Sequence, residues 1–119
     1  PSRNKYQPIL NHALDFIKEN FTDPDMSLTW VAQQVALSPS HFSTIFSQSF
    51  NQTFIDYLTE QRIELAKKLL QQSDYRISDI AFEIGYNDPN YFSYLFKKKQ
   101  GISPKEYRTQ LFLKNKNNQ

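Results

Sequence analysis

A chain of 119 residues, 39% hydrophobic and with a formal net charge of +2 at pH 7, fits one domain whose core needs no disulfide or metal. Because the chain holds no cysteine, a disulfide framework, a cysteine nucleophile and a thiolate metal site are excluded, which fits a reducing cytoplasm. No apolar run approaches the roughly 20 residues of a membrane span, so we expect no membrane partner.

The first predicted helix spans residues 8–20, where apolar residues recur every three or four positions. The chain starts at Pro1 rather than at a methionine, which favours a fragment cut from a longer protein. His12 lies beside the apolar stripe and far along the chain from His41, the other histidine, so a metal site is not expected. Residues 21–25 are predicted to form a turn, and their carboxylates have no neighbouring base that would indicate catalysis.

Two segments, 27–52 and 76–102, are versions of one another. Their apolar residues match first at an offset of 49 residues and then at 50, so the second segment has one extra residue in its turn. The matches are Leu28, Val31, Ala32 and Val35 with Ile77, Ile80, Ala81 and Ile84, followed by Pro39, Phe42, Ser43 and Phe46 with Pro89, Phe92, Ser93 and Phe96.

Each segment is predicted to form a short helix, a tight turn and a second helix, which together make a helix-turn-helix. The second helix starts with a polar cap followed by proline, as Ser38-Pro39 and as Asp88-Pro89. Gly85 is suited to end the earlier helix of the second segment, whereas Ala36 at the matching position is less suited to a left-handed backbone.

The outward face of each second helix is predicted to be polar. The predicted core residues are Phe42, Ile45, Phe46 and Phe50 in the first segment and Tyr91, Phe92, Leu95 and Phe96 in the second. The remaining positions are Ser40, Ser43, Thr44, Ser47 and Gln48, and Asn90, Ser93, Tyr94, Lys97 and Lys98. Short uncharged donors and acceptors suit a helix that lies against base edges in a DNA groove, but a protein contact surface or an ordinary solvated face remains an alternative.

Residues 53–72 carry the longest helical pattern and contain no Gly or Pro. Thr53 can cap this helix, and the Asp56 carboxylate suits its positively polarised first turn. At about 1.5 Å per residue the helix is roughly 30 Å long, close to the roughly 34 Å between successive turns of a DNA major groove. We therefore expect it to connect two DNA-reading units.

A last helix is predicted over residues 103–111, because Ser103-Pro104 and Glu106 form a capping box with proline at the first helical position. Residues 112–119 are expected to be a disordered tail. Charge is uneven along the chain. Residues 1–60 hold three Lys or Arg against six Asp or Glu, and residues 61–119 hold eleven against six. A polyanion would therefore be drawn to the C-terminal half.

Residues 77–108, ISDIAFEIGYNDPNYFSYLFKKKQGISPKEYR, closely resemble the signature segment of the AraC/XylS family of bacterial transcription regulators. The resemblance implies an all-α domain over residues 8–111, with about seven helices in two helix-turn-helix units joined by a long helix. It also implies a double-stranded DNA operator read in two successive major-groove segments, RNA polymerase as a partner, and a sensor or receiver domain in the full-length chain. Such a domain works in the bacterial cytoplasm at the nucleoid, as in a transcription activator, and has no catalytic residue, metal or cofactor.

The resemblance places base-reading residues on the second helix of each unit, namely Ser40, Ser43 and Thr44, and Asn90, Ser93 and Tyr94, together with Pro89. We expect phosphate contacts from Ser38, Lys97, Lys98 and Lys99. Arg62 is expected to pair structurally with an acid such as Glu64, although a phosphate contact is the alternative.

The chain departs from the family pattern in its first unit. Ala36 and Asn51 stand where glycine is common, and the first reading helix lacks a frequent Arg or Gln. In the second unit, Pro89 replaces a side chain that could hydrogen-bond. We therefore expect the first unit to read DNA weakly. The rival hypothesis is a helical protein-interaction module that keeps the fold without binding DNA specifically.

Overall fold

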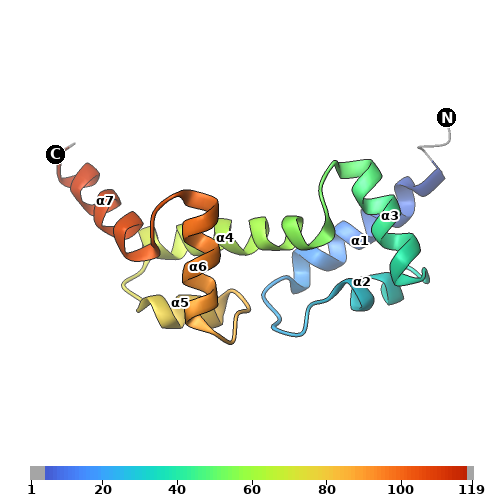
Figure 1. The fold of residues 1–119 in the computed structure, drawn as a ribbon, viewed down its shortest axis with the longest axis horizontal. Helices are drawn as coiled ribbons and strands as arrows, with labels where there is room; N and C mark the ends of the chain where they lie inside the picture. Colours follow the sequence, from blue (N-terminus) through green and yellow to red (C-terminus); the bar gives the residue numbers. More distant parts are fainter. Residues whose placement is uncertain (1–4, 118–119) are drawn as a thin grey trace. The chain divides into compact units, whose positions relative to one another are not determined.

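The structure is a computed structural model that describes residues 5–117, and these residues form seven α-helices and no strand (Figure 1). The predicted all-α fold is confirmed. The helices are α1 (Gln7–Asn20), α2 (Leu28–Gln34), α3 (Pro39–Phe50), α4 (Phe54–Gln72), α5 (Ile77–Glu83), α6 (Pro89–Gln100) and α7 (Pro104–Asn117). The chain divides into two compact units, Pro1–Gln61 and Arg62–Gln119, which we call unit 1 and unit 2. The division falls inside α4.

Unit 1 buries its apolar side chains around Phe46 of α3. The ring of Phe46 lies 5.8 Å from that of Phe42 and 4.7 Å from that of Phe50. Phe54 and Tyr57 from the first turn of α4 also contact it, at 6.1 Å and 5.5 Å. The buried core of the unit consists of Ala13, Ile17, Met26, Val31, Ala32, Phe42, Phe46, Phe54 and Leu58. Aromatic ring contacts therefore join α3 to the first turn of α4.

Unit 2 repeats this arrangement around Phe96 of α6. Its ring lies 5.9 Å from that of Phe92 and 5.4 Å from that of Tyr107 on α7. The buried core consists of Ile63, Ala66, Leu70, Ile80, Ala81, Ile84, Tyr86, Phe92 and Phe96. α4 thus supplies side chains to both cores, from its first part in unit 1 and from its later part in unit 2.

The internal repeat is longer than the helix-turn-helix segments. Thr53 caps α4 by accepting the Asp56 N–H at 3.0 Å, and Ser103 accepts the Glu106 N–H at 3.1 Å at the start of the C-terminal helix. Tyr57 and Tyr107 then pack edge-on against Phe46 and Phe96. The buried residues of α1, Leu10, Ala13 and Ile17, have the same spacing as Ile63, Ala66 and Leu70 in α4. Each unit is therefore built from four helical segments, and α4 serves as the last of one and the first of the other.

Both turns of the predicted helix-turn-helix pairs use a left-handed backbone. Gly85 has φ +111°, and Ala36 at the matching position has φ +56°. The helices α3 and α6 also end in left-handed residues, Asn51 at φ +56° and Gly101 at φ +84°. The turn of unit 1 therefore forms without glycine, because a φ near +56° lies in the small left-handed region open to L-residues, at a cost of about 1–2 kcal/mol.

The C-terminal helix is longer than predicted. α7 continues to Asn117 instead of ending at residue 111, so part of the predicted disordered tail, 112–119, is helical, and residues 118 and 119 lie outside the described residues. Leu111, Phe112 and Leu113 are compatible with a helix, and the last turn carries Lys114 and Lys116, which the negative end of the helix dipole favours.

Arg108 ties the start of α7 to the end of α4. Its guanidinium donates to the backbone carbonyls of Leu70 at 3.1 Å, Ser73 at 3.2 Å and Tyr75 at 2.6 Å. The last carbonyls of a helix lack intrahelical partners, so this side chain satisfies acceptors that would otherwise need water. Arg108 thereby fixes the loop that leads from α4 to α5.

Candidate DNA-binding surface

The N-terminus of α3 is held by its predicted cap. The Ser38 hydroxyl accepts the backbone N–H of His41 at 3.1 Å, and Pro39 occupies the first helical turn. Phe42 and Phe46 are fully buried, which directs the opposite side of the helix outward. On that outward side Ser40 and Thr44 are exposed and Ser43 is half-buried. The three predicted reading residues of unit 1 therefore share one face.

The hydroxyl of Thr44 is partly committed within the helix. Its Oγ1 donates to the backbone carbonyl of Ser40 at 3.1 Å. The oxygen can still accept a hydrogen bond and the methyl group can make apolar contacts, but donation to a base would require this bond to break. Ser38 is different, because its cap uses the hydroxyl oxygen as an acceptor and leaves the hydroxyl hydrogen available to donate to another group.

The N-terminus of α6 has the same design. The Asp88 carboxylate accepts the backbone N–H of Asn90 at 2.9 Å. Phe92 is fully buried, and on the outward side Asn90 and Tyr94 are exposed while Ser93 is half-buried. The predicted reading residues of unit 2 therefore also lie together on one face.

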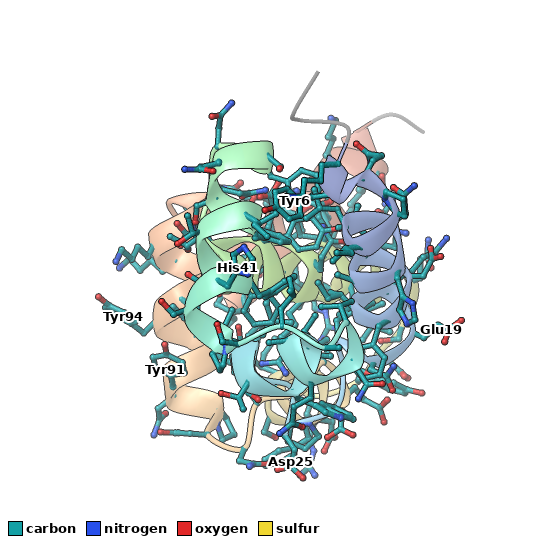
Figure 2. All side chains as sticks on the ribbon, turned by 90° about the vertical axis from the view of Figure 1, so that its right-hand side faces the viewer. Tyr6, Glu19, Asp25, His41, Tyr91 and Tyr94 are labelled. Carbon is teal, nitrogen blue, oxygen red and sulfur yellow. The ribbon has the colours of Figure 1, made fainter. Side chains whose placement is uncertain are left out.

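The prediction that Tyr91 belongs to the core is wrong. Its side chain is 51% exposed, and that of Tyr94 is 60% exposed. Tyr86 from the turn is buried instead and packs on Phe92 with ring centroids 6.2 Å apart. Figure 2 shows Tyr91 and Tyr94 on the outer side of α6, pointing away from the packed side of the helix.

Three consecutive lysines, Lys97, Lys98 and Lys99, are exposed in the last turn of α6. A positive charge there is stabilised by the negative end of the helix dipole, so the lysines also have a structural reason to be where they are. The ammonium group of Lys98 lies 6.0 Å from the centre of the Tyr94 ring. A basic edge therefore adjoins the predicted reading face of unit 2.

Arg62 is buried rather than exposed on this surface. It is 5% exposed, and its guanidinium lies over the ring of Tyr86 at 4.8 Å. Gly85 has φ +111°, which L-residues rarely adopt, and an added Cβ would also meet that guanidinium at 2.8 Å, so both the backbone and the close approach favour glycine here. Glu64, the acid named as a possible partner, forms an ion pair with Lys67 at 3.0 Å. The structural interpretation of Arg62 is therefore favoured over a phosphate contact, with an aromatic ring as its neighbour.

Other kinds of site have little support in residues 5–117. No group of three His, Asp or Glu in this part of the chain could hold a metal ion. None of its helices is long and apolar enough to span a membrane. Each unit instead presents one capped helix, with polar residues outward and a pair of phenylalanines inward.

Comparison with known proteins agrees with this architecture. Residues 31–110 match the family described as helix-turn-helix domain. The chain is 34% identical over 103 residues to the uncharacterized transcriptional regulatory protein YesN of Bacillus subtilis, covering 84% of this chain and 28% of YesN. It is 35% identical over 99 residues to the arabinose operon regulatory protein of Escherichia coli, covering 83% and 34%.

A solved structure is similar over most of its length. The C-terminal domain of AraT, a response regulator from Geobacillus stearothermophilus, superposes with a TM-score of 0.85 at 36% identity, covering 87% of this chain and 86% of that one. The chain spans about a third of the length of the curated relatives named above. The names of both relatives describe them as regulatory proteins.

Proposed function

Because the chain belongs to the AraC/XylS family of transcription regulators, as a helix-turn-helix DNA-binding domain, we propose that its reading surfaces are the outward faces of α3 and α6. The observation that carries the proposal is the repeated unit, in which a capped helix turns buried phenylalanines inward and short polar side chains outward. A helix of this kind fits the width of a B-DNA major groove.

The individual roles follow from chemistry and exposure. We assign contacts with base edges to Ser40, Ser43, Thr44, Asn90, Ser93 and Tyr94. Phosphate contacts are assigned to Ser38, Lys97, Lys98 and Lys99. Hydroxyls and amides can donate to and accept from base edges, whereas lysines that bind phosphates act through charge and carry no sequence information.

Each unit is proposed to read one of two successive major-groove segments of an operator. Two features support this: the reading helix recurs with the same kind of cap and the same buried phenylalanine pair, and the two units are joined through one unbroken 19-residue helix, α4. A continuous helix is a stiffer connection than a flexible linker.

The full-length protein is proposed to carry a sensor or receiver domain besides this one, since the chain covers about a third of its curated relatives and resembles the C-terminal domain of a response regulator. Action as an activator through RNA polymerase, in the cytoplasm at the nucleoid, belongs to the same proposal. The similarity to a protein named lactose operon transcription activator, 36% identical over 107 residues, supports activation.

Gel shifts with a random-sequence duplex at two salt concentrations test DNA binding. We expect the logarithm of the association constant to fall with the logarithm of salt concentration by about 0.9 for each phosphate contact. A protein-interaction module would show no duplex binding or no such slope. Selection of bound sequences from a random duplex pool then tests specificity, because a domain that only retains the fold would enrich no site.

A further inference from the structure

Two neighbouring tyrosines form an exposed aromatic surface on α6. The rings of Tyr91 and Tyr94 are stacked, with centroids 6.4 Å apart and planes 23° from parallel. Both side chains are more than half exposed to solvent. Large apolar surfaces gathered in one place on a folded domain mark contact sites more often than isolated exposed residues do.

The pair rests on a buried support. Tyr91 packs edge-on against Tyr86, with centroids 5.9 Å apart and planes at 75°. Tyr86 is 8% exposed and is covered by the Arg62 guanidinium at 4.8 Å. Tyr86 restricts the ring of Tyr91, and the ring of Tyr94 is stacked on that of Tyr91. Both rings therefore lose little conformational freedom when they bind a partner. A preorganised apolar surface of this kind is suited to a small apolar target.

The major groove offers one apolar group on its base edges, the C5-methyl group of thymine. We propose that the Tyr91–Tyr94 pair contacts thymine methyl groups, so that the part of the operator beneath α6 prefers thymine. This inference rests on the proposed function and deepens it. The rings, rather than the phenolic hydroxyls, carry the preference, and Lys98 beside Tyr94 orients the pair by attraction to a neighbouring phosphate.

Unit 1 has no equivalent pair. The positions that match Tyr91 and Tyr94 are His41 and Thr44. His41 packs edge-on against Tyr6 at 5.8 Å, and Thr44 bonds to the backbone of its own helix. The thymine preference that comes from aromatic rings is therefore confined to the segment read by unit 2.

Replacement of thymine by uracil tests the inference, since it removes the methyl group and leaves the pairing edge unchanged. The probe is the duplex that the domain enriches from a random pool, with each thymine replaced by uracil one at a time. For the unaltered domain we expect binding to weaken about fourfold at one or more thymines, the factor expected when one methyl group is no longer buried.

Matched variants separate the ring from the hydroxyl. Tyr91→Ala and Tyr94→Ala should bind the thymine and uracil duplexes equally at those positions, whereas Tyr91→Phe and Tyr94→Phe should keep the fourfold difference. His41→Ala is the control from unit 1 and should also keep it. Circular dichroism shows that each variant folds, which the exposure of both rings leads us to expect.

Three results would overturn the inference while leaving the proposed function standing. The first is equal binding of every thymine and uracil duplex by the unaltered domain, and the second is a difference that persists in the alanine variants. The third is a difference that disappears in the Phe variants, because the hydroxyls rather than the rings would then carry the preference. A domain that enriches no sequence and binds without salt dependence would overturn the proposed function together with this inference.

Discussion

The two units share one packing plan but differ at the residues that allow their turns. In unit 2 both left-handed positions are glycine, at Gly85 and Gly101, whereas unit 1 uses Ala36 and Asn51. The difference is greatest at the interhelical turn, where φ is +111° for Gly85 and +56° for Ala36. The packing plan therefore requires a left-handed backbone at each place, and it requires glycine only where φ goes beyond the region open to other residues.

The units also differ in charge. No charged residue occurs from residue 27 to residue 52, whereas α6 carries three lysines in its last turn. Electrostatic attraction to a phosphate backbone therefore has to come mainly from unit 2, since uncharged hydroxyls release no counterions. In the proposed complex, unit 1 adds contacts to a duplex that unit 2 attracts.

Gly85→Ala should lower the stability of the fold more than the other substitutions do. Comparison with Gly101→Ala separates backbone strain from overpacking as the cause of that loss. An added Cβ at Gly85 would meet the Arg62 guanidinium at 2.8 Å, and nothing lies within 4 Å of the added Cβ at Gly101. We expect Gly85→Ala to lower the free energy of unfolding by about 2–4 kcal/mol, through strain and overpacking together. Gly101→Ala should cost about 1–2 kcal/mol from strain alone. Urea unfolding measures both, and equal losses would show that the close approach to Arg62 is unimportant.

Replacing Lys97, Lys98 and Lys99 by glutamine tests the charge difference. We expect binding to all duplexes to weaken roughly tenfold, about 1.4 kcal/mol, and the salt slope to flatten by about 0.9 for each phosphate that is no longer neutralised. Gel shifts over a salt series measure this slope. Lys114→Gln with Lys116→Gln on α7 is the control for net charge. The reciprocal change, Gln48→Lys at the position matching Lys98, should make the salt slope steeper. If neither change altered the slope, the three lysines would be ordinary solvated residues without phosphate contacts.

Ser93→Ala and Ser43→Ala compare the two reading faces directly, since these serines occupy matching positions and both are half-buried. For Ser93→Ala we expect the selected base to change at a few positions, with a loss of about 1 kcal/mol for the original site. For Ser43→Ala the loss should be smaller, because unit 1 lacks the flanking charge that holds α6 against the groove. Site selection with each variant is the measurement. An unchanged selected sequence for Ser93→Ala would show that the reading face is wrongly assigned.

Ala36→Gly should have the smallest effect and the opposite sign. Glycine relieves the left-handed strain of Ala36, worth about 1–2 kcal/mol, but adds freedom to the unfolded chain, so we expect a net gain of about 0.5 kcal/mol. Asn51→Gly should gain less, since asparagine tolerates this conformation. Thermal and urea unfolding measure both changes. A loss of stability in Ala36→Gly would contradict the conclusion that the left-handed backbone strains Ala36.

Local signals predicted much of the fold. The caps at Ser38, Asp88 and Ser103 each make their backbone hydrogen bond, because capping depends on residues only two or three positions apart. The spacing of the phenylalanines likewise predicted the buried faces of α3 and α6, since a helix fixes which positions share a side.

Nonlocal contacts account for what was missed. Tyr91 looked apolar enough for the core, but Tyr86 from the turn is the tyrosine buried against Phe92, and no pattern within α6 reveals a contact from outside the helix. The neighbour of Arg62 was also unpredictable, because Tyr86 lies far along the chain. The extension of the repeat into α4, in contrast, has a local signal in the sequence, because Thr53 and Tyr57 recur as Ser103 and Tyr107.

The sharing of α4 has a consequence for how the protein folds. In a tandem array each repeat is stabilised by its own contacts and by those with its neighbour, and here the neighbours have one helix in common. Phe54 and Leu58 belong to one hydrophobic cluster and Ile63 and Ala66 to the other, only a few residues further along the same rod. When either cluster forms, it nucleates its part of α4. The helix can then be extended into the other unit without the free-energy cost of forming a new first turn. The two units should therefore unfold with more cooperativity than two domains joined by a flexible linker. A cleavage within α4 would leave two fragments, each with an incomplete helix beside its hydrophobic core.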